Sequence, residues 1–150
     1  MTGSAAIPLR SPRATLEGYV ILPRLIDKVR LHAQGTLAPA YVAQLLAPEP
    51  ALDGRFLAFT RLDAEALRRA ILSVATDDDV LAWVERHACP RSDAEKHAWA
   101  ASIDAYRPDA ERVTRRQASY PAVAARFDVG AISVFDLIDL DEGRIAAPTR

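Results

Sequence analysis

The clearest hydrophobic pattern in the chain lies between residues 22 and 34. Apolar side chains recur there every three or four residues, and at 100° per residue they fall on one stripe. The stripe consists of Leu22, Leu25, Ile26, Val29 and Ala33. Gly35 then supplies the usual stop signal. This pattern predicts an amphipathic helix over Leu22–Gln34.

One apolar residue, Leu31, lies on the side of this predicted helix that otherwise carries Arg24, Asp27 and Lys28. An apolar residue among charges indicates a second contact surface, so we expect the helix to be central rather than peripheral. Charged groups that are covered from both sides lose water and need partners. Asp27 has Arg24 and Arg30 three residues away on either side, where helical neighbours can pair.

Shorter patterns predict further helices along the rest of the chain. Asp63 and Asp109 each stand where a helix is expected to begin. Thr76-Asp-Asp-Asp79 and Ser92-Asp-Ala-Glu95 both have the capping-box form, and the three acids after Thr76 stand at a helix N-terminus, where the dipole favours them. The predicted segments are a short helix that begins at Ser11-Pro12 and ends at Gly18, one turn over residues 41–46, residues 55–60 capped by Asp53, a helix after Asp63, residues 80–88, residues 92–106, a helix after Asp109, and a turn over residues 123–127.

The segment of residues 131–143 fits two structures. Val134, Leu137 and Ile138 share a helical face behind Ser133 as N-cap, whereas the run from Ala131 to Phe135 also has strand propensity. We favour a helix, because no second convincing strand is available for pairing.

Together these patterns predict an all-α fold. We expect one compact domain of about seven short helices over residues 11–145, arranged around Leu22–Gln34. A flexible arm over residues 1–10 and a frayed tail over residues 146–150 complete the prediction.

Composition narrows the class of protein. The 150 residues carry 19 Lys and Arg against 20 Asp and Glu, a net charge of −1, so no global field favours nucleic acid or a membrane surface. Cys89 is the single cysteine, which excludes an internal disulfide and suits a reducing compartment. The first residues lack the apolar core of a signal peptide, and no run of about 18 apolar residues is present. We therefore expect a cytoplasmic protein.

The first candidate site is a basic set on and before the predicted central helix: Arg13, Arg24, Lys28 and Arg30. Arginine offers a planar fork for phosphate or carboxylate, and lysine adds a point charge. The first hypothesis is an anion-binding site. The alternative is structural, in which these cations pair with Asp27, Glu17 and other acids and hold the N-terminal segment in place.

A second candidate set consists of acid–base groups. Asp27, His32 and Tyr41 could act together with Lys28, which would serve as a base or Schiff-base nucleophile if it lost its proton. Spacing along one helix does not by itself establish a catalytic site.

A metal site is the third possibility considered. His87, Cys89, Asp93 and His97 are residue types that suit zinc, but the paired spacings of zinc knuckles are missing. His87 is better interpreted as a cation near a helix C-terminus and Cys89 as a small hydrophobe. We predict no metal and no cofactor.

Several exact spacings recur together in the first 90 residues: Ser11-Pro-Arg13, Gly18-Tyr-Val20, Leu22-Pro-Arg-Leu-Ile-Asp-Lys-Val-Arg30, Leu52-Asp-Gly-Arg-Phe-Leu-Ala-Phe59 and Thr76-Asp-Asp-Asp-Val-Leu-Ala-Trp-Val84. In these motifs the chain resembles an uncharacterised bacterial domain-of-unknown-function family with the pattern SPR followed by LPRxIDKxR. The resemblance implies a small, mostly helical bacterial protein and implies no activity.

The sequence thus predicts a binding or interaction module with an anion contact on the LPRLIDKVR helix. The expected partner is a small anionic ligand or another protein, with no membrane and no nucleic acid. The alternative is a small-molecule enzyme that uses Asp27, Lys28, His32 or Tyr41.

Overall fold

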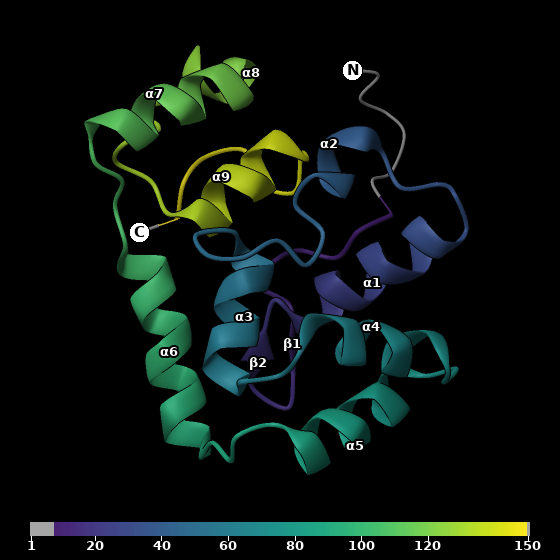
Figure 1. Cartoon of the computed structure of the whole chain (residues 1–150). Coiled ribbons are helices and arrows are strands. Elements are labelled where there is room, and N and C mark those ends of the chain that lie inside the picture. Colours follow the sequence, from purple (N-terminus) through teal and green to yellow (C-terminus); the bar gives the residue numbers. More distant parts are fainter. Residues whose placement is uncertain (1–7, 150) are drawn as a thin grey trace. The chain divides into compact units, whose positions relative to one another are not determined.

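A computed structural model describes residues 8–149 of the chain, and this part is mostly helical (Figure 1). The elements are β1 (Thr15–Leu16), β2 (Tyr19–Val20), α1 (Leu22–Ala33), α2 (Pro39–Val42), α3 (Leu52–Thr60), α4 (Ala64–Leu72), α5 (Asp77–His87), α6 (Asp93–Ala105), α7 (Ala110–Ser119), α8 (Pro121–Ala124) and α9 (Val134–Asp141). The predicted helical class is confirmed, with a small two-stranded hairpin as the exception.

The hairpin replaces the short helix that was predicted to begin at Ser11. Strands β1 and β2 pair antiparallel, and Glu17 and Gly18 form the two-residue connection, both with positive φ, 48° and 84°. Two such residues in succession give the tight turn that matches the twist of paired strands. The Ser11 hydroxyl accepts the backbone N–H of Arg13 at 3.1 Å, a local turn that competes with a helix. The helix prediction was therefore wrong here.

Helix α1 is the central element of a compact unit formed by residues 8–97. Leu22, Leu25 and Ile26 are completely buried, and the helix contacts β1, α2 and α4. The helix ends at Ala33, one residue before the predicted end, because Gln34 is the C-cap. The charged side is covered as well, since Arg24 and Lys28 are both buried.

The N-cap signals predicted for later helices are present in the structure. Asp63, Thr76 and Asp109 each accept the backbone N–H three residues ahead, as the prediction requires. Ser92 and Glu95 form the complete capping box, with Ser92 Oγ accepting the Glu95 amide at 3.1 Å and Glu95 Oε1 accepting the Ser92 amide at 2.8 Å. Local sequence is sufficient to predict these helix starts, because the two hydrogen-bonded residues of each cap lie within one helical turn.

Among the described residues, 98–149 form a second compact unit. Its core contains Val123, Val129, Ile132 and Leu137, from α8, α9 and the connection between them. Ser133 Oγ accepts the Asp136 amide at 3.0 Å and begins α9, so the helix favoured for residues 131–143 is confirmed.

The predicted domain limits need two corrections. Residues 1–7 of the predicted arm lie outside the described residues, but Leu9 is buried and Arg10 is hydrogen bonded, so residues 8–10 are not a loose arm. In the predicted frayed tail, Thr149 donates to the Asp136 carboxylate through its amide and its hydroxyl, both at 2.8 Å. A single domain over residues 11–145 stays a prediction, because the chain clusters into two units.

No helix between residues 8 and 149 combines the length and the apolar character needed to cross a membrane.

Candidate functional site

A buried ion pair connects α1 to α3. Lys28 Nζ lies 2.8 Å from Asp53 Oδ1, with only 6% and 1% of the two side chains exposed. The second carboxylate oxygen of Asp53 accepts the backbone N–H of Leu46 at 2.8 Å. Asp53 was predicted to cap a helix over residues 55–60, but α3 begins at Leu52 and Asp53 lies inside its first turn. The prediction was wrong, because the N-cap of α3 is Ala51 and the two Asp53 oxygens bind Lys28 and the Leu46 amide instead of capping the helix.

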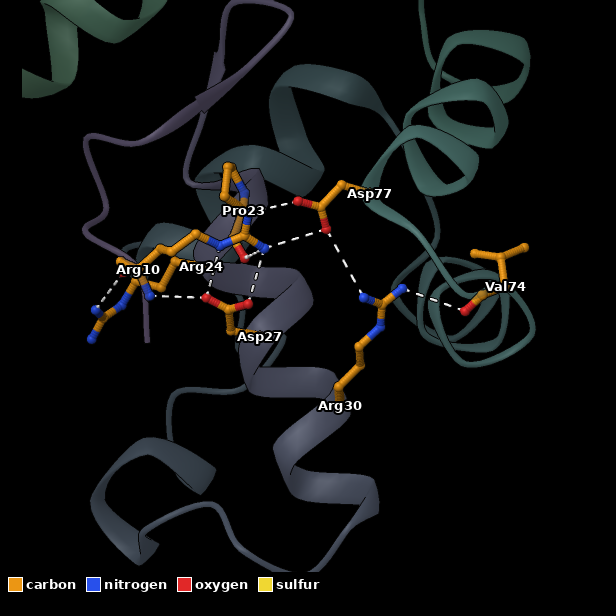
Figure 2. Close-up of polar contacts among 7 residues, drawn as sticks. All are labelled: Arg10, Pro23, Arg24, Asp27, Arg30, Val74 and Asp77. Atoms are coloured by element: carbon orange, nitrogen blue, oxygen red, sulfur yellow. Dashed lines mark hydrogen bonds and ion pairs between the residues drawn. The ribbon is translucent and has the colours of Figure 1, made fainter. Parts of the chain in front are cut away.

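A second polar cluster is centred on Arg10, which binds Asp27 of α1 (Figure 2). The Arg10 guanidinium binds both oxygens of Asp27, with Nη2 to Oδ1 at 2.9 Å and Nε to Oδ2 at 3.1 Å. The same guanidinium reaches Asp77, at the start of α5, with Nη1 to Oδ2 at 2.6 Å. The Arg10 amide also donates to Asp27 Oδ2 at 2.9 Å. One arginine therefore ties the segment before β1 to both α1 and α5.

Hydrogen bonds between Arg10 and Asp77 shift the titration of both groups. Hydrogen bonding to Arg10 holds the pKa of Asp77 below its ordinary value, against the opposing effect of burial. The two carboxylates correspondingly raise the pKa of Arg10 above its already high value. Both groups are ionised at neutral pH, as a charge-assisted pair requires.

Arg24 and Arg30, two members of the predicted basic set, extend the cluster in opposite directions (Figure 2). The buried Arg24 donates to the Arg10 carbonyl at 3.0 Å, and its guanidinium lies over the Tyr41 ring, 5.5 Å from the centroid. Arg30 is 28% exposed, and its guanidinium lies 3.9 Å from Asp77 Oδ1 and 3.4 Å from the Val74 carbonyl oxygen. Arg30 is thus the more loosely held of the two.

The other predicted residues are more dispersed. Arg13 lies half-buried in the turn before β1, and Tyr41 lies half-buried in α2. The Nδ1 atom of His32 is buried and has no hydrogen-bond partner among the described residues. The acid–base set is therefore not brought together: Asp27 binds Arg10, Lys28 binds Asp53, and His32 stands apart.

The region considered for zinc has another arrangement. His87 Nδ1 lies 2.8 Å from the Trp83 carbonyl oxygen one helical turn away, at the end of α5 as predicted. Over residues 8–149 no group of three or more His, Cys, Asp and Glu side chains has the geometry to hold a metal ion.

Sequence reasoning did not identify Arg10 as an organising residue. Its partners Asp27 and Asp77 lie 17 and 67 positions away, and no local pattern relates residues so distant. Asp77 is also one of three acids in the first turn of α5, where the helix dipole favours negative charge. The signal that the sequence offered was a basic residue, Arg10, beside the apolar Leu9.

These contacts and motifs can be compared with known families. The family model described as domain of unknown function (DUF5069) matches residues 6–144. The chain belongs to this family. The family resemblance inferred from the motifs is thereby confirmed, and the match extends beyond them through α9. Membership of DUF5069 brings no activity with it, and no curated protein matches the chain.

Proposed function

We propose that this protein is a binding module that recognises an anionic group, a phosphate or a carboxylate, at the α1 face that carries Arg30. The observation that supports this proposal is the loose hold on Arg30. Its nearest carboxylate oxygen is 3.9 Å away and its contact to the Val74 carbonyl is long, at 3.4 Å. An incoming anion can therefore bind this guanidinium without breaking a short ion pair.

The four predicted cations have different parts in this proposal. Lys28 and Arg24 are buried and hold α1 in place through Asp53 and the Arg10 carbonyl, so direct contact with a ligand falls to the more accessible Arg30. Arg13 is half-buried and adds positive charge before β1. The anion would meet a guanidinium on a rigid helix, which keeps the entropic cost of binding low.

A thermal-shift screen of phosphate, sulfate, nucleotides and carboxylates tests this proposal. A ligand that binds the folded state alone raises the melting temperature, and the shift should disappear in Arg30→Gln. Arg68→Gln is the matched control, because Arg68 is an α4 arginine of similar exposure that pairs with Glu65. If no anion across the panel stabilises the wild type, or if both variants lose the shift equally, the proposal fails.

The alternative, a small-molecule enzyme built on Asp27, Lys28, His32 and Tyr41, has less support. A Schiff-base lysine must lose its proton, and a carboxylate 2.8 Å away in a buried site favours the charged form. Asp27 is hydrogen bonded by both the amide and the guanidinium of Arg10, so its oxygens are engaged rather than aimed at a substrate.

A further inference from the structure

Helices α4 and α5 leave between them an open groove of about 400 Å³. Only residues 73–76 join the two helices, so they fold back against each other. The groove has a simple origin in the sequence, because α4 contributes the small side chains of Ala66 and Ala70 while α5 contributes the large ring of Trp83. The groove is separate from the polar cluster around Arg10 and Asp27, and nothing described so far gives it a role.

The apolar wall of the groove is held in a fixed orientation. The Trp83 indole stacks on the His87 ring, with centroids 4.4 Å apart and planes at 21°. His87 is itself fixed by the 2.8 Å contact between its Nδ1 and the Trp83 carbonyl oxygen. A half-buried indole supported in this way can pack against a flat apolar group with little loss of side-chain freedom.

The charges that line the groove come from both helices. Arg69 of α4 and Arg86 of α5 are exposed, and neither guanidinium makes an ion pair or hydrogen bond with the described part of the chain. Asp79 contributes one carboxylate. It lies in the first turn of α5, whereas Arg86 lies in the last turn, so charge of opposite sign is separated along that helix.

We propose that this groove binds a small anion with a flat apolar body, an aryl carboxylate or aryl phosphate. The ring would pack against Trp83, Ala66 and Ala70, and the anionic group would be held between Arg69 and Arg86. Arg69 and Arg86 line the groove from its two helices, and a guanidinium fork matches a planar carboxylate or phosphate oxygens. The volume falls within the range of about 300–1,000 Å³ that is usual for small-molecule sites.

The groove proposal does not rest on the proposed function at Arg30, because Arg30 does not line the groove. The two sites adjoin at Val74, which lines the groove and whose carbonyl oxygen lies 3.4 Å from the Arg30 guanidinium. The probe is 1-naphthoate, titrated into the full chain while backbone amide shifts are followed by NMR. We expect shifts concentrated in α4 and α5, and affinity that falls as salt is added. The neutral analogue 1-naphthamide should bind at least about fivefold more weakly, since it lacks the charge.

Variants assign the contacts. Arg69→Gln with Arg86→Gln should weaken 1-naphthoate binding at least about tenfold, whereas Arg68→Gln, outside the groove, should leave it unchanged. Asp79→Asn should strengthen binding by a few fold, because it removes a carboxylate that lines the groove and repels the anion. All four substituted side chains are at least partly exposed, so the variants should fold, and unchanged spectra of α1 amides verify this.

Three results overturn the proposal: no shifts in α4 and α5 at millimolar 1-naphthoate, equal binding of 1-naphthamide, or equal losses in Arg68→Gln and the double variant. Arg30→Gln distinguishes the two sites, because it should leave naphthoate binding in the groove intact. Loss of the anion-induced thermal shift in Arg30→Gln, with naphthoate binding in the groove unchanged, supports both proposals. Naphthoate binding that is lost in Arg30→Gln but kept in the double variant contradicts this one.

Discussion

Lys28 Nζ lies 2.8 Å from Asp53 Oδ1, and this pair connects the central helix α1 to α3 in an almost completely buried site. Removing two charges from water carries a large desolvation cost. Only the attraction between the two buried partners offsets that cost, so the loss of either partner is destabilising. The Leu46 amide supplies a further hydrogen bond to the same carboxylate. Lys28 and Asp53 therefore have a structural role, and each residue needs the other to fulfil it.

Breaking the pair from either side should be strongly destabilising. We expect Lys28→Met or Asp53→Asn each to lower the free energy of unfolding by about 3–5 kcal/mol, because each change breaks this buried ion pair. Replacement of both residues by leucine should cost less than the sum of the two single changes. Urea denaturation measures all three. Arg68→Met, at an exposed i,i+3 pair with Glu65, should cost less than about 1 kcal/mol, and a similar loss at both places would contradict this assignment.

Arg10 should make the stability depend on pH. The pKa of Asp77 is lowered in the folded protein, chiefly by Arg10, so the stabilisation is fully present above the ordinary Asp pKa of about 4. It is lost as the pH falls through the lowered value. Arg10→Gln should therefore lose about 1 kcal/mol relative to wild type at pH 7, a modest figure because both side chains are partly exposed, and the difference should shrink below about pH 4. Thermal melts between pH 3 and pH 7 measure it.

The control for that experiment is Arg115→Gln, at an i,i+4 pair with Glu111 that is exposed on both sides. It should show almost no pH-dependent difference from wild type. A difference between wild type and Arg10→Gln that stays constant down to pH 3 would exclude Asp77 as the titrating partner.

Gly54 marks a close approach of two backbone segments. A Cβ placed on Gly54 would lie 2.2 Å from the Glu49 amide nitrogen and 2.3 Å from the Pro48 carbonyl carbon, so the backbone itself would have to shift. We expect Gly54→Ala to cost at least about 3 kcal/mol. At Gly35, with φ +75° and nothing within 4 Å of its Cβ position, alanine adds only the left-handed strain of about 1 kcal/mol. Circular dichroism melts compare them, and equal losses would argue against the close approach.

Lys28 should be unreactive as a Schiff-base lysine. Its buried ion pair with Asp53 favours the ammonium, which is not nucleophilic. Incubation with pyruvate or a simple aldehyde followed by borohydride, with peptide mass spectrometry, should show no modification of Lys28. Specific trapping at Lys28 above the level at Lys96 would support the enzyme alternative instead.

Prediction from sequence was most successful where the signal is local. The α1 stripe, the caps at Thr76 and Ser92, and the start of α9 at Ser133 are each confirmed, because the interacting groups lie within a turn or two of the same helix. The hairpin was missed because its strands have only two residues each, too short for an alternating pattern.

The candidate site shows the same division. The sequence predicts that α1 is a helix with charges on a covered side. It leaves two roles open for these charges, ion pairs or a ligand site. Only the folded chain shows that Lys28 turns to Asp53 and that Asp27 binds Arg10, from a segment predicted to be loose. The burial that makes each pair strong is itself a product of tertiary packing.

The sequence by itself thus determined the helical class, the central helix and the family, because periodicity, caps and exact motif spacings are written along the chain. The tertiary structure alone decided which charges meet and which stay available, since Arg10 and Asp77 are 67 positions apart. It also placed Arg69 and Arg86 beside Trp83, because a groove exists only once two helices pack.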